Sequence, residues 1–320
     1  EIDAEGHASA SPSTKRQAPD VRPGDLPPGF VAIDVAAHLG MQLCDPDRMV
    51  AGINGFAGYA PIGVNDHPSA GNGFIGASCE AQGPRQAKVV VAANGGSDLI
   101  YVPDGDAARI ADVASFLLKQ DYVGAVFVDA ARPPAGTLSL RDINLTGSAR
   151  TPTPSIVVAL RSFSRDPKDP VRTQVDVSDN TLQEGQGMHG GFWRADVTNT
   201  MIAFGPDFKR GFVDRAPASN ADIAPTLSRL LGLAMPGRGR LKGRALSEAL
   251  AGGPATTPST CGELAARPAA KSARTAIHFQ MAAGVRYLDA AKVFTGPVSW
   301  GDWADALPCG RAKTAAATKR

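Results

Sequence analysis

The chain has 320 residues, enough for one large domain or two modest ones. Hydrophobic residues make up 43% and charged residues 20%, which is ordinary for a soluble globular protein. The net charge of +2 gives no electrostatic argument for a nucleic-acid partner. No apolar stretch approaches the roughly 18 residues that a membrane-spanning helix needs, so we expect no membrane span.

The first half of the chain predicts a flexible arm followed by an α/β segment. Residues 1–24 are rich in Ser, Ala, Pro and charge and have no periodicity, which indicates an arm. Residues 25–150 form the α/β segment, although its Gly- and Asn-rich part at 45–80 looks irregular. Its expected elements are a strand or short helix at 30–39, strands at 88–93 and 99–102 paired as a hairpin, a helix at 106–120 and a strand at 122–128. Asn94 and Asp98 lie at the hairpin turn, and we favour a turn role for them over a binding role.

The second half predicts a core segment, a linker and a terminal hairpin. Residues 151–252 contain the core, and 253–270 are a linker rich in Pro, Ala and Thr. Residues 271–320 are a hairpin, with its turn at Ala282-Ala283, and a tail. Short apolar runs predict strands at 155–160, 173–177 and 200–204, the last of them buried. A helix is expected from Asp222, because Ser219 or Asn220 can cap it and an apolar stripe follows. That stripe consists of Ile223, Leu227, Leu230 and Leu231.

The candidate site residue is His189, which lies in the run Gly187-Met188-His189-Gly190-Gly191-Phe192. The flanking glycines permit tight backbone torsions and the close approach of other groups. A neutral imidazole nitrogen on such a loop is available as a metal ligand. A lone histidine between glycines is more often a structural loop residue, because a zinc site normally needs three or four protein ligands.

The region around His189 resembles the C-terminal part of the alkaline phosphatase superfamily, in the branch of type I phosphodiesterases and nucleotide pyrophosphatases. The resemblance rests on the Gly-x-His-Gly histidine, on Gly205-Pro206-Asp207-Phe208-Lys209 and on Asp222-Ile223-Ala224-Pro225-Thr226-Leu227. The segment Gly243-Arg244-Ala245-Leu246 is similar to a Gly-Arg-x-Leu element of the family. The resemblance covers residues 25–290 and is most specific over 183–251. Sulfatases share the Asp-Ile-Ala-Pro-Thr-Leu type of helix, but the context of His189 fits the phosphodiesterase branch better.

The resemblance implies a fold and a chemistry. The expected fold is the C-terminal part of an alkaline-phosphatase-like α/β/α core of parallel strands, with residues 25–150 as an inserted β-α subdomain. The family hydrolyses phosphoric esters with two divalent metal ions, zinc being the usual choice, and a Thr or Ser nucleophile. The Gly-x-His-Gly histidine is one of its metal ligands, which makes His189 the expected ligand here. The substrate class would be a small-molecule phosphate ester.

The other elements of the family's site are not found in this sequence. Four further histidines are interpreted as structural or surface residues rather than ligands. They are His7, His38, His67 and His278. His67 follows Asp66 as in the family's Asp-His-Gly element, but Pro68 stands where the glycine would be. We therefore expect this chain to be the C-terminal portion of a longer hydrolase, lacking the nucleophile and most metal ligands and inactive by itself.

Two alternatives remain beside that hypothesis. The chain could be a non-catalytic truncated remnant, or a binding subunit that depends on a partner, such as the missing N-terminal half. Relatives of the family are commonly exported, which implies a periplasmic or secreted protein. Two disulfides can form in such a compartment, but the sequence does not say which of the three pairings occurs. The cysteines are Cys44, Cys79, Cys261 and Cys309.

Overall fold

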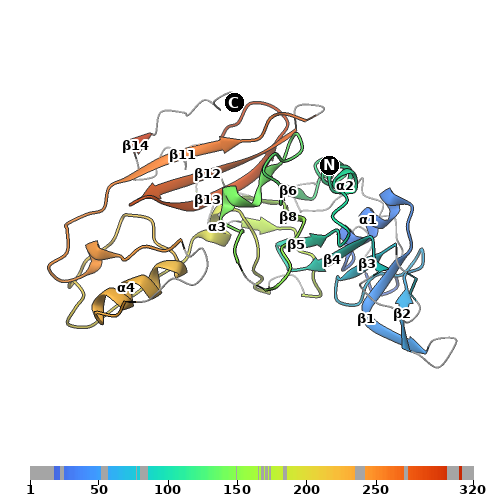
Figure 1. The fold of residues 1–320 in the computed structure, drawn as a ribbon, viewed down its shortest axis with the longest axis horizontal. Helices are drawn as coiled ribbons and strands as arrows, with labels where there is room; N and C mark the ends of the chain where they lie inside the picture. Colours follow the sequence, from blue (N-terminus) through green and yellow to red (C-terminus); the bar gives the residue numbers. More distant parts are fainter. Residues whose placement is uncertain are drawn as a thin grey trace.

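The protein is seen in a computed structural model. It describes residues 18–21, 25–51, 57–76, 78–79, 86–148, 150–164, 166, 169, 172, 174–182, 186–234, 242–269, 273–300 and 310–311. Most of the expected N-terminal arm, together with His7 and Cys309, lies outside these residues. The described part is a mixed α/β fold built on an eight-stranded sheet, which confirms the predicted α/β class (Figure 1). No helix in that part has the length and hydropathy needed to cross a membrane.

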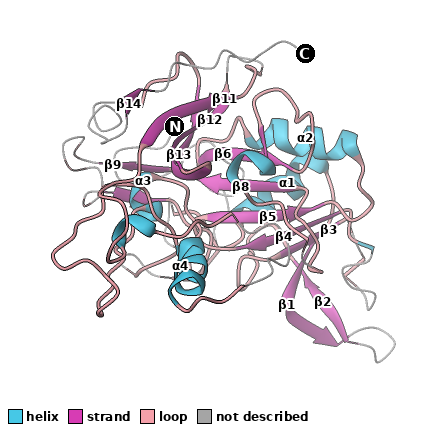
Figure 2. Ribbon diagram, turned by 60° about the vertical axis from the view of Figure 1, so that its left-hand side comes forward, coloured by secondary structure: helices cyan, strands magenta, loops and turns pink. Residues whose placement is uncertain are grey.

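The large sheet has the strand order β2-β1-β3-β4-β5-β8-β6-β7 (Figure 2). Its strands are β1 (Leu43–Ala51), β2 (Ala57–Pro61), β3 (Gly73–Ile75), β4 (Val89–Ala93), β5 (Ser97–Tyr101), β6 (Val123–Val128), β7 (Leu138–Ser139) and β8 (Ile156–Leu160). Only the pair β6–β7 is parallel within this sheet. The expectation of a parallel core was therefore wrong for the described residues. A short turn joins β4 to β5, and so short a connection can form only an antiparallel pair.

Two helices cover one face of this sheet. Helix α1 (Phe30–Leu39) lies between Gly29 and Gly40, both in the left-handed region, which settles the ambiguity between strand and helix. Helix α2 (Ala107–Leu117) begins at Asp106, whose side chain accepts the backbone N–H groups of Ala108 and Arg109. Both helices pack in one hydrophobic cluster with alternate residues of β6 and β8. The remaining residues of β6 and β8 point to the opposite face, as the two-residue period of a strand requires.

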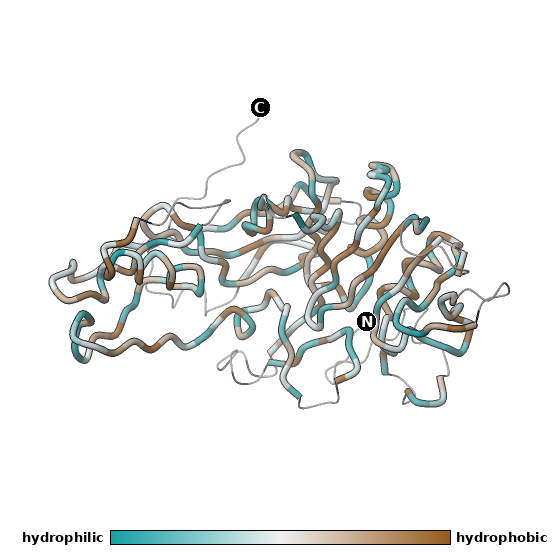
Figure 3. Tube along the Cα trace, turned by 60° about the horizontal axis from the view of Figure 1, so that its bottom comes forward, coloured by the Kyte–Doolittle hydropathy of each residue, from teal (hydrophilic) through white to brown (hydrophobic). Residues whose placement is uncertain are grey.

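A second sheet covers that opposite face. It has the order β13-β12-β11-β14 and consists of β11 (Ser259–Ala265), β12 (Arg274–Ala282), β13 (Val285–Phe294) and β14 (Gly310–Arg311). Ile277 and Ala291 pack against Phe127 and its neighbours. The molecule is therefore layered as helices, large sheet and second sheet, with the hydrophobic stretches concentrated in the middle (Figure 3). The predicted α/β/α core would have helices on both faces of the large sheet, but the second sheet covers one of these faces instead.

Four predicted segments differ from the structure. The expected linker at 253–270 contributes β11, and the irregular region at 45–80 contributes β1, β2 and β3. The terminal hairpin turns at Ala283 and Gly284, one residue later than predicted, because both adopt the positive φ that a two-residue turn needs. The segment Thr200–Phe204 forms no strand. Its Ile202 and Phe204 are 85% and 93% exposed, because no described part of the chain covers them.

Short elements complete the chain between the sheets. They are η3 (Leu140–Ile143), β9 (Ser162–Ser164), β10 (Gln174–Asp176), α3 (Arg194–Val197), η4 (Asn220–Asp222), α4 (Ile223–Leu230) and η5 (Ser247–Ala249). Helix α4 confirms the helix predicted after Asp222 and lies far from α1 and β1 (Figure 1). Its apolar residues Ile223, Leu227 and Leu231 are 45%, 47% and 68% exposed. Three of the four residues of the predicted apolar stripe therefore face solvent, and Leu230 is half-buried.

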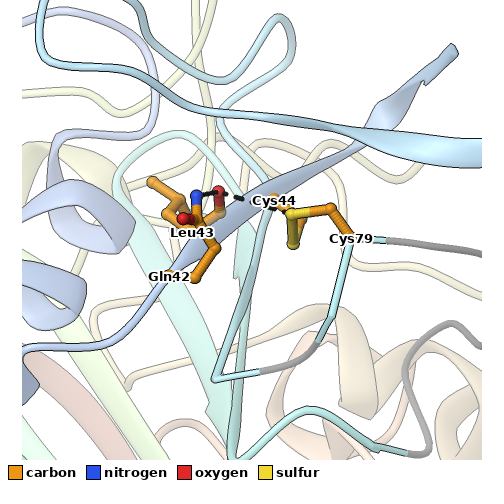
Figure 4. The surroundings of a disulfide bond; sticks show 4 residues. All are labelled: Gln42, Leu43, Cys44 and Cys79. Atoms are coloured by element: carbon orange, nitrogen blue, oxygen red, sulfur yellow. Dashed lines mark hydrogen bonds between the residues drawn. A yellow bond between two sulfur atoms is a disulfide. The ribbon is translucent and has the colours of Figure 1, made fainter.

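A disulfide joins Cys44 of β1 to Cys79, 35 residues further on (Figure 4). Beside it, the Gln42 side chain donates a hydrogen bond to the carbonyl of Leu43 at 2.8 Å. Cys261 is also disulfide-bonded. The structure thus identifies one of the two disulfides whose pairing the sequence left open, namely Cys44–Cys79.

Candidate metal site

His189 lies on the loop between β10 and α3, and backbone contacts hold this loop against the β4–β5 turn. The N–H of Gly96 donates to the carbonyl of His189 at 2.8 Å. A Cβ on Gly96 would lie 2.5 Å from the Gly191 nitrogen. A Cβ on Gly190 would lie 2.5 Å from the Asn94 carbonyl oxygen. The glycines of the turn and of the loop therefore permit an approach that larger residues would block, as predicted for the glycines around His189.

Replacing Gly190 with alanine should lower the free energy of unfolding by about 1–3 kcal/mol. Gly190 has φ +93°, a conformation that costs any other residue energy, and the added Cβ would collide with Asn94. Urea denaturation measures the change. The matched control is Gly187→Ala in the same loop, because a Cβ there meets no atom within 4 Å. Equal effects of the two substitutions would contradict the close fit of loop and turn.

His189 is exposed, and its imidazole could offer a metal ion one nitrogen ligand. No group of three or more His, Cys, Asp or Glu side chains in the described part of the chain is arranged to hold a metal ion. Zinc sites use three or four protein ligands, and a two-ion site uses more. The described residues therefore do not form a two-ion centre by themselves.

The other described histidines lie apart from His189, and each contacts a carboxylate. The three pairs are His38–Asp112 at 3.0 Å, His67–Asp20 at 3.1 Å and His278–Asp289 at 2.9 Å. His38 lies on α1 and stacks on Phe116, and His278 lies within β12. These contacts give each of the three histidines a carboxylate partner in the described structure.

The C-terminal end of the loop is anchored by Asp196 of α3. Its carboxylate accepts the N–H of Trp193 at 3.0 Å and the side-chain amide of Gln174 at 3.1 Å. Burial, together with the nearby Asp176, raises the pKa of Asp196 to about 6. The contribution of Asp196 to stability is therefore greatest in acid and falls as pH rises through about 6.

Two buried carboxyl groups lie on the other side of the turn from the loop. Asp98 in β5 and Asp179, in the segment after β10, both have 0% exposure. The Asp179 carboxylate accepts the N–H of Gly29 at 2.6 Å, at the start of α1. Burial raises the pKa of Asp98 well above its ordinary value and that of Asp179 to about 7. The sequence offered one weak sign of this pair, namely an aspartate at the edge of the apolar run of β5.

The segments that carry the family resemblance contact one another around Asp222. The buried Asp222 carboxylate accepts the N–H of Arg244 at 2.8 Å, and the Thr226 hydroxyl accepts the N–H of Leu246 at 3.0 Å. The Tyr287 hydroxyl of β13 also donates to Asp222, at 3.1 Å. The helix after Asp222 is thereby attached to the Gly-Arg-x-Leu segment and to the second sheet, which gives these residues a structural role.

Comparison with known proteins gives no relative for this chain: no family model, curated protein or solved structure matches it.

Proposed function

We propose that this chain is the C-terminal portion of a metal-dependent hydrolase of phosphoric esters, similar to the phosphodiesterases and nucleotide pyrophosphatases of the alkaline phosphatase superfamily. His189 is proposed as one ligand of a centre of two divalent ions, with zinc the favoured metal. The nucleophile and the remaining ligands would come from chain that precedes this sequence. By itself the chain is expected to be inactive.

The observation that carries this proposal is the setting of His189. The loop is fixed to the turn by Gly96 and the glycines around it, while the imidazole is exposed. A ligand needs a defined backbone position and an accessible ring nitrogen, and His189 has both. A merely structural histidine would be expected to have a hydrogen-bonded ring, as His67 and His278 do.

A second observation supports the need for additional chain. The run Thr200–Phe204 is apolar on both of its alternating faces, which is typical of a strand buried within a parallel sheet. Ile202 and Phe204 are nonetheless exposed, as is most of the apolar stripe of α4. Large exposed apolar groups of this kind usually mark a surface that another segment covers. The proposed N-terminal half is a natural occupant.

The same exposed residues favour the second candidate, a partner-dependent subunit without catalysis. The disulfide between Cys44 and Cys79 fits either candidate in an oxidising compartment, and we propose a periplasmic or secreted location.

The test is to express this chain joined to the segment encoded upstream of Glu1 and to assay hydrolysis of bis-p-nitrophenyl phosphate with zinc. Hydrolysis should require zinc, be abolished by a chelator and fall more than about 100-fold in His189→Ala, since even residues outside the ligand set contribute 10- to 100-fold. The control is His38→Ala, which removes an exposed histidine bound to Asp112. Zinc-dependent hydrolysis that survives His189→Ala would overturn the ligand assignment. A joined protein that folds but hydrolyses no phosphoric ester would favour the non-catalytic subunit.

A further inference from the structure

The buried carboxyl pair beneath the β4–β5 turn has a feature that the proposed metal chemistry does not use. Asp98 and Asp179 come from different parts of the chain, interact with each other and have no exposure to solvent. Two ionised carboxylates cannot stay together in such a place, because burial and mutual repulsion both disfavour the charges. At least one of the two must therefore hold a proton in the folded protein.

The hydrogen bonds show which carboxyl holds it. Asp179 accepts the N–H of Gly29 at 2.6 Å and that of Val31 at 3.5 Å, so the positive end of α1 favours its anionic form. Among the described residues, Asn94 is the one whose N–H Asp98 accepts, through Oδ1 at 3.3 Å. Its Oδ2 is buried and accepts no N–H from the described residues. A proton on Asp98, donated to Asp179, gives that oxygen a partner and leaves the charge at the helix end.

Within the described residues, the charged side chains that act on Asp98 and Asp179 are carboxylates, and no positive side chain is among them. Asp34 of α1 faces the pair and is itself buried, and it accepts the hydroxyl of Tyr122 at 3.0 Å. Burial and the nearby carboxylates raise the pKa of Tyr122 well above its ordinary value, so this hydroxyl stays neutral. The carboxylate of Asp34 therefore adds negative charge beside Asp98 and Asp179, which favours the protonated form of the pair.

The pair and the His189 loop hold the same turn from opposite sides. The N–H of Asp179 donates to the carbonyl of Gly95 at 2.8 Å, and Asp98 accepts the N–H of Asn94. On the other side, the next residue, Gly96, donates to the carbonyl of His189. Any separation of the two carboxyls would therefore move the surface on which the loop rests.

We propose that Asp98 and Asp179 form a proton-sharing latch that fixes the β4–β5 turn and, through it, the His189 loop. Loss of the proton from Asp98 leaves two repelling carboxylates and loosens the loop. An acid that holds its proton more tightly when folded stabilises the folded form fully at low pH and loses that effect as pH rises through the raised pKa. Each retained proton changes the opening equilibrium by about tenfold per pH unit in that range. The latch is independent of the proposed metal chemistry.

Amide hydrogen exchange by NMR tests the latch between about pH 5 and pH 8, where the folded and unfolded carboxyls differ in charge. After correction for intrinsic exchange, protection of the Gly96 N–H should fall by at least about tenfold per pH unit. In Asp98→Asn the amide can still donate to Asp179 but cannot titrate, so the slope should decrease by one proton, or about tenfold per pH unit. Asp112→Asn, an exposed aspartate on α2, should keep the wild-type slope. The Trp193 N–H reports separately on Asp196.

Three results would overturn the latch: a Gly96 protection that does not depend on pH, an unchanged slope in Asp98→Asn, or equal changes at Gly96 and at the core amide of Val126. The last would mean that the titration unfolds the whole protein rather than the loop. Should Asp98→Asn fail to fold, the carboxyl carbon shift of Asp98 in the wild-type chain decides the matter. A protonated shift at neutral pH supports the latch, and an ionised shift rejects it.

Discussion

Arg244→Ala should lower the free energy of unfolding by about 3–5 kcal/mol, because it would leave Glu248 as an uncompensated buried charge. The Arg244 guanidinium contacts Glu248 at 2.6 Å and 3.0 Å, and Glu248 has no exposed surface. Arg244 also donates to the Tyr287 hydroxyl at 2.9 Å and to the Pro217 carbonyl at 3.0 Å. One side chain thus joins η5, the segment before α4 and the second sheet.

Urea denaturation of the wild type and the variant measures the change. The control is Arg172→Ala, since Arg172 and Asp169 approach to 3.9 Å and are 85% and 44% exposed. Exposed pairs contribute no more than about 1 kcal/mol, so the two substitutions should differ several-fold. Equal losses would show that burial does not govern the strength of the Arg244 pair.

The effect of Arg244→Ala should also depend on pH. Burial would raise the pKa of Glu248, but the hydrogen bonds from Arg244 outweigh it and lower the pKa to about 2. A lowered carboxyl pKa stabilises the fold above the ordinary value of about 4.5 and loses that effect as pH falls through about 2. The difference between wild type and variant should therefore be full at neutral pH and shrink in strong acid.

Removing the disulfide in Cys44→Ala/Cys79→Ala should lower the free energy of unfolding by about 3–4 kcal/mol, the value expected for a closed loop of 35 residues. The loop contains β2 and β3, which both pair with β1, so an unfolded chain without the bond gains freedom across three strands. Thermal unfolding without reductant measures the change. Because reductant would also act on Cys261, the double variant is needed to assign the effect.

A loss below about 1 kcal/mol would contradict this expectation. It would mean that backbone contacts hold the ends of the loop without the bond, for example the hydrogen bond from the Tyr59 N–H to the Cys79 carbonyl at 2.7 Å. The Cys261→Ala variant provides the comparison, because it removes the other disulfide and leaves β1, β2 and β3 joined.

Local patterns were sufficient to predict the elements whose partners are close in sequence. The β4–β5 hairpin, α2 and β6 form within one stretch of chain, and apolar runs on both sides of a turn and a helical apolar period identify them. Strand β11 was not predicted because its sequence is polar and contains Gly. It forms a strand because it pairs with β12 along its length. Its pairing partner could not be read from residues 253–270.

Predictions that depend on distant chain fared differently. The apolar run Thr200–Phe204 predicted burial, but burial requires another surface, which the described residues do not provide. The tight backbone setting of His189 followed from its glycines, whereas its contact with Gly96 could not, since the turn and the loop are far apart in sequence. The pairing of Asp98 with Asp179 could not be predicted either, because these residues are also far apart in sequence. They meet only because the folded chain buries both of them in one place, and no local sequence pattern indicates this.

The position of β8 has a consequence for synthesis of the chain on the ribosome. Strand β8 lies between β5 and β6 in the sheet but follows both in sequence. A nascent chain that has emerged only as far as β6 carries two strands with unpaired inner edges, which a neighbouring chain could capture. The hairpin of β12 and β13, which covers Phe127, emerges later still. Vectorial synthesis therefore delays closure of the sheet until residues 156–160 emerge and leaves one face bare until about residue 294.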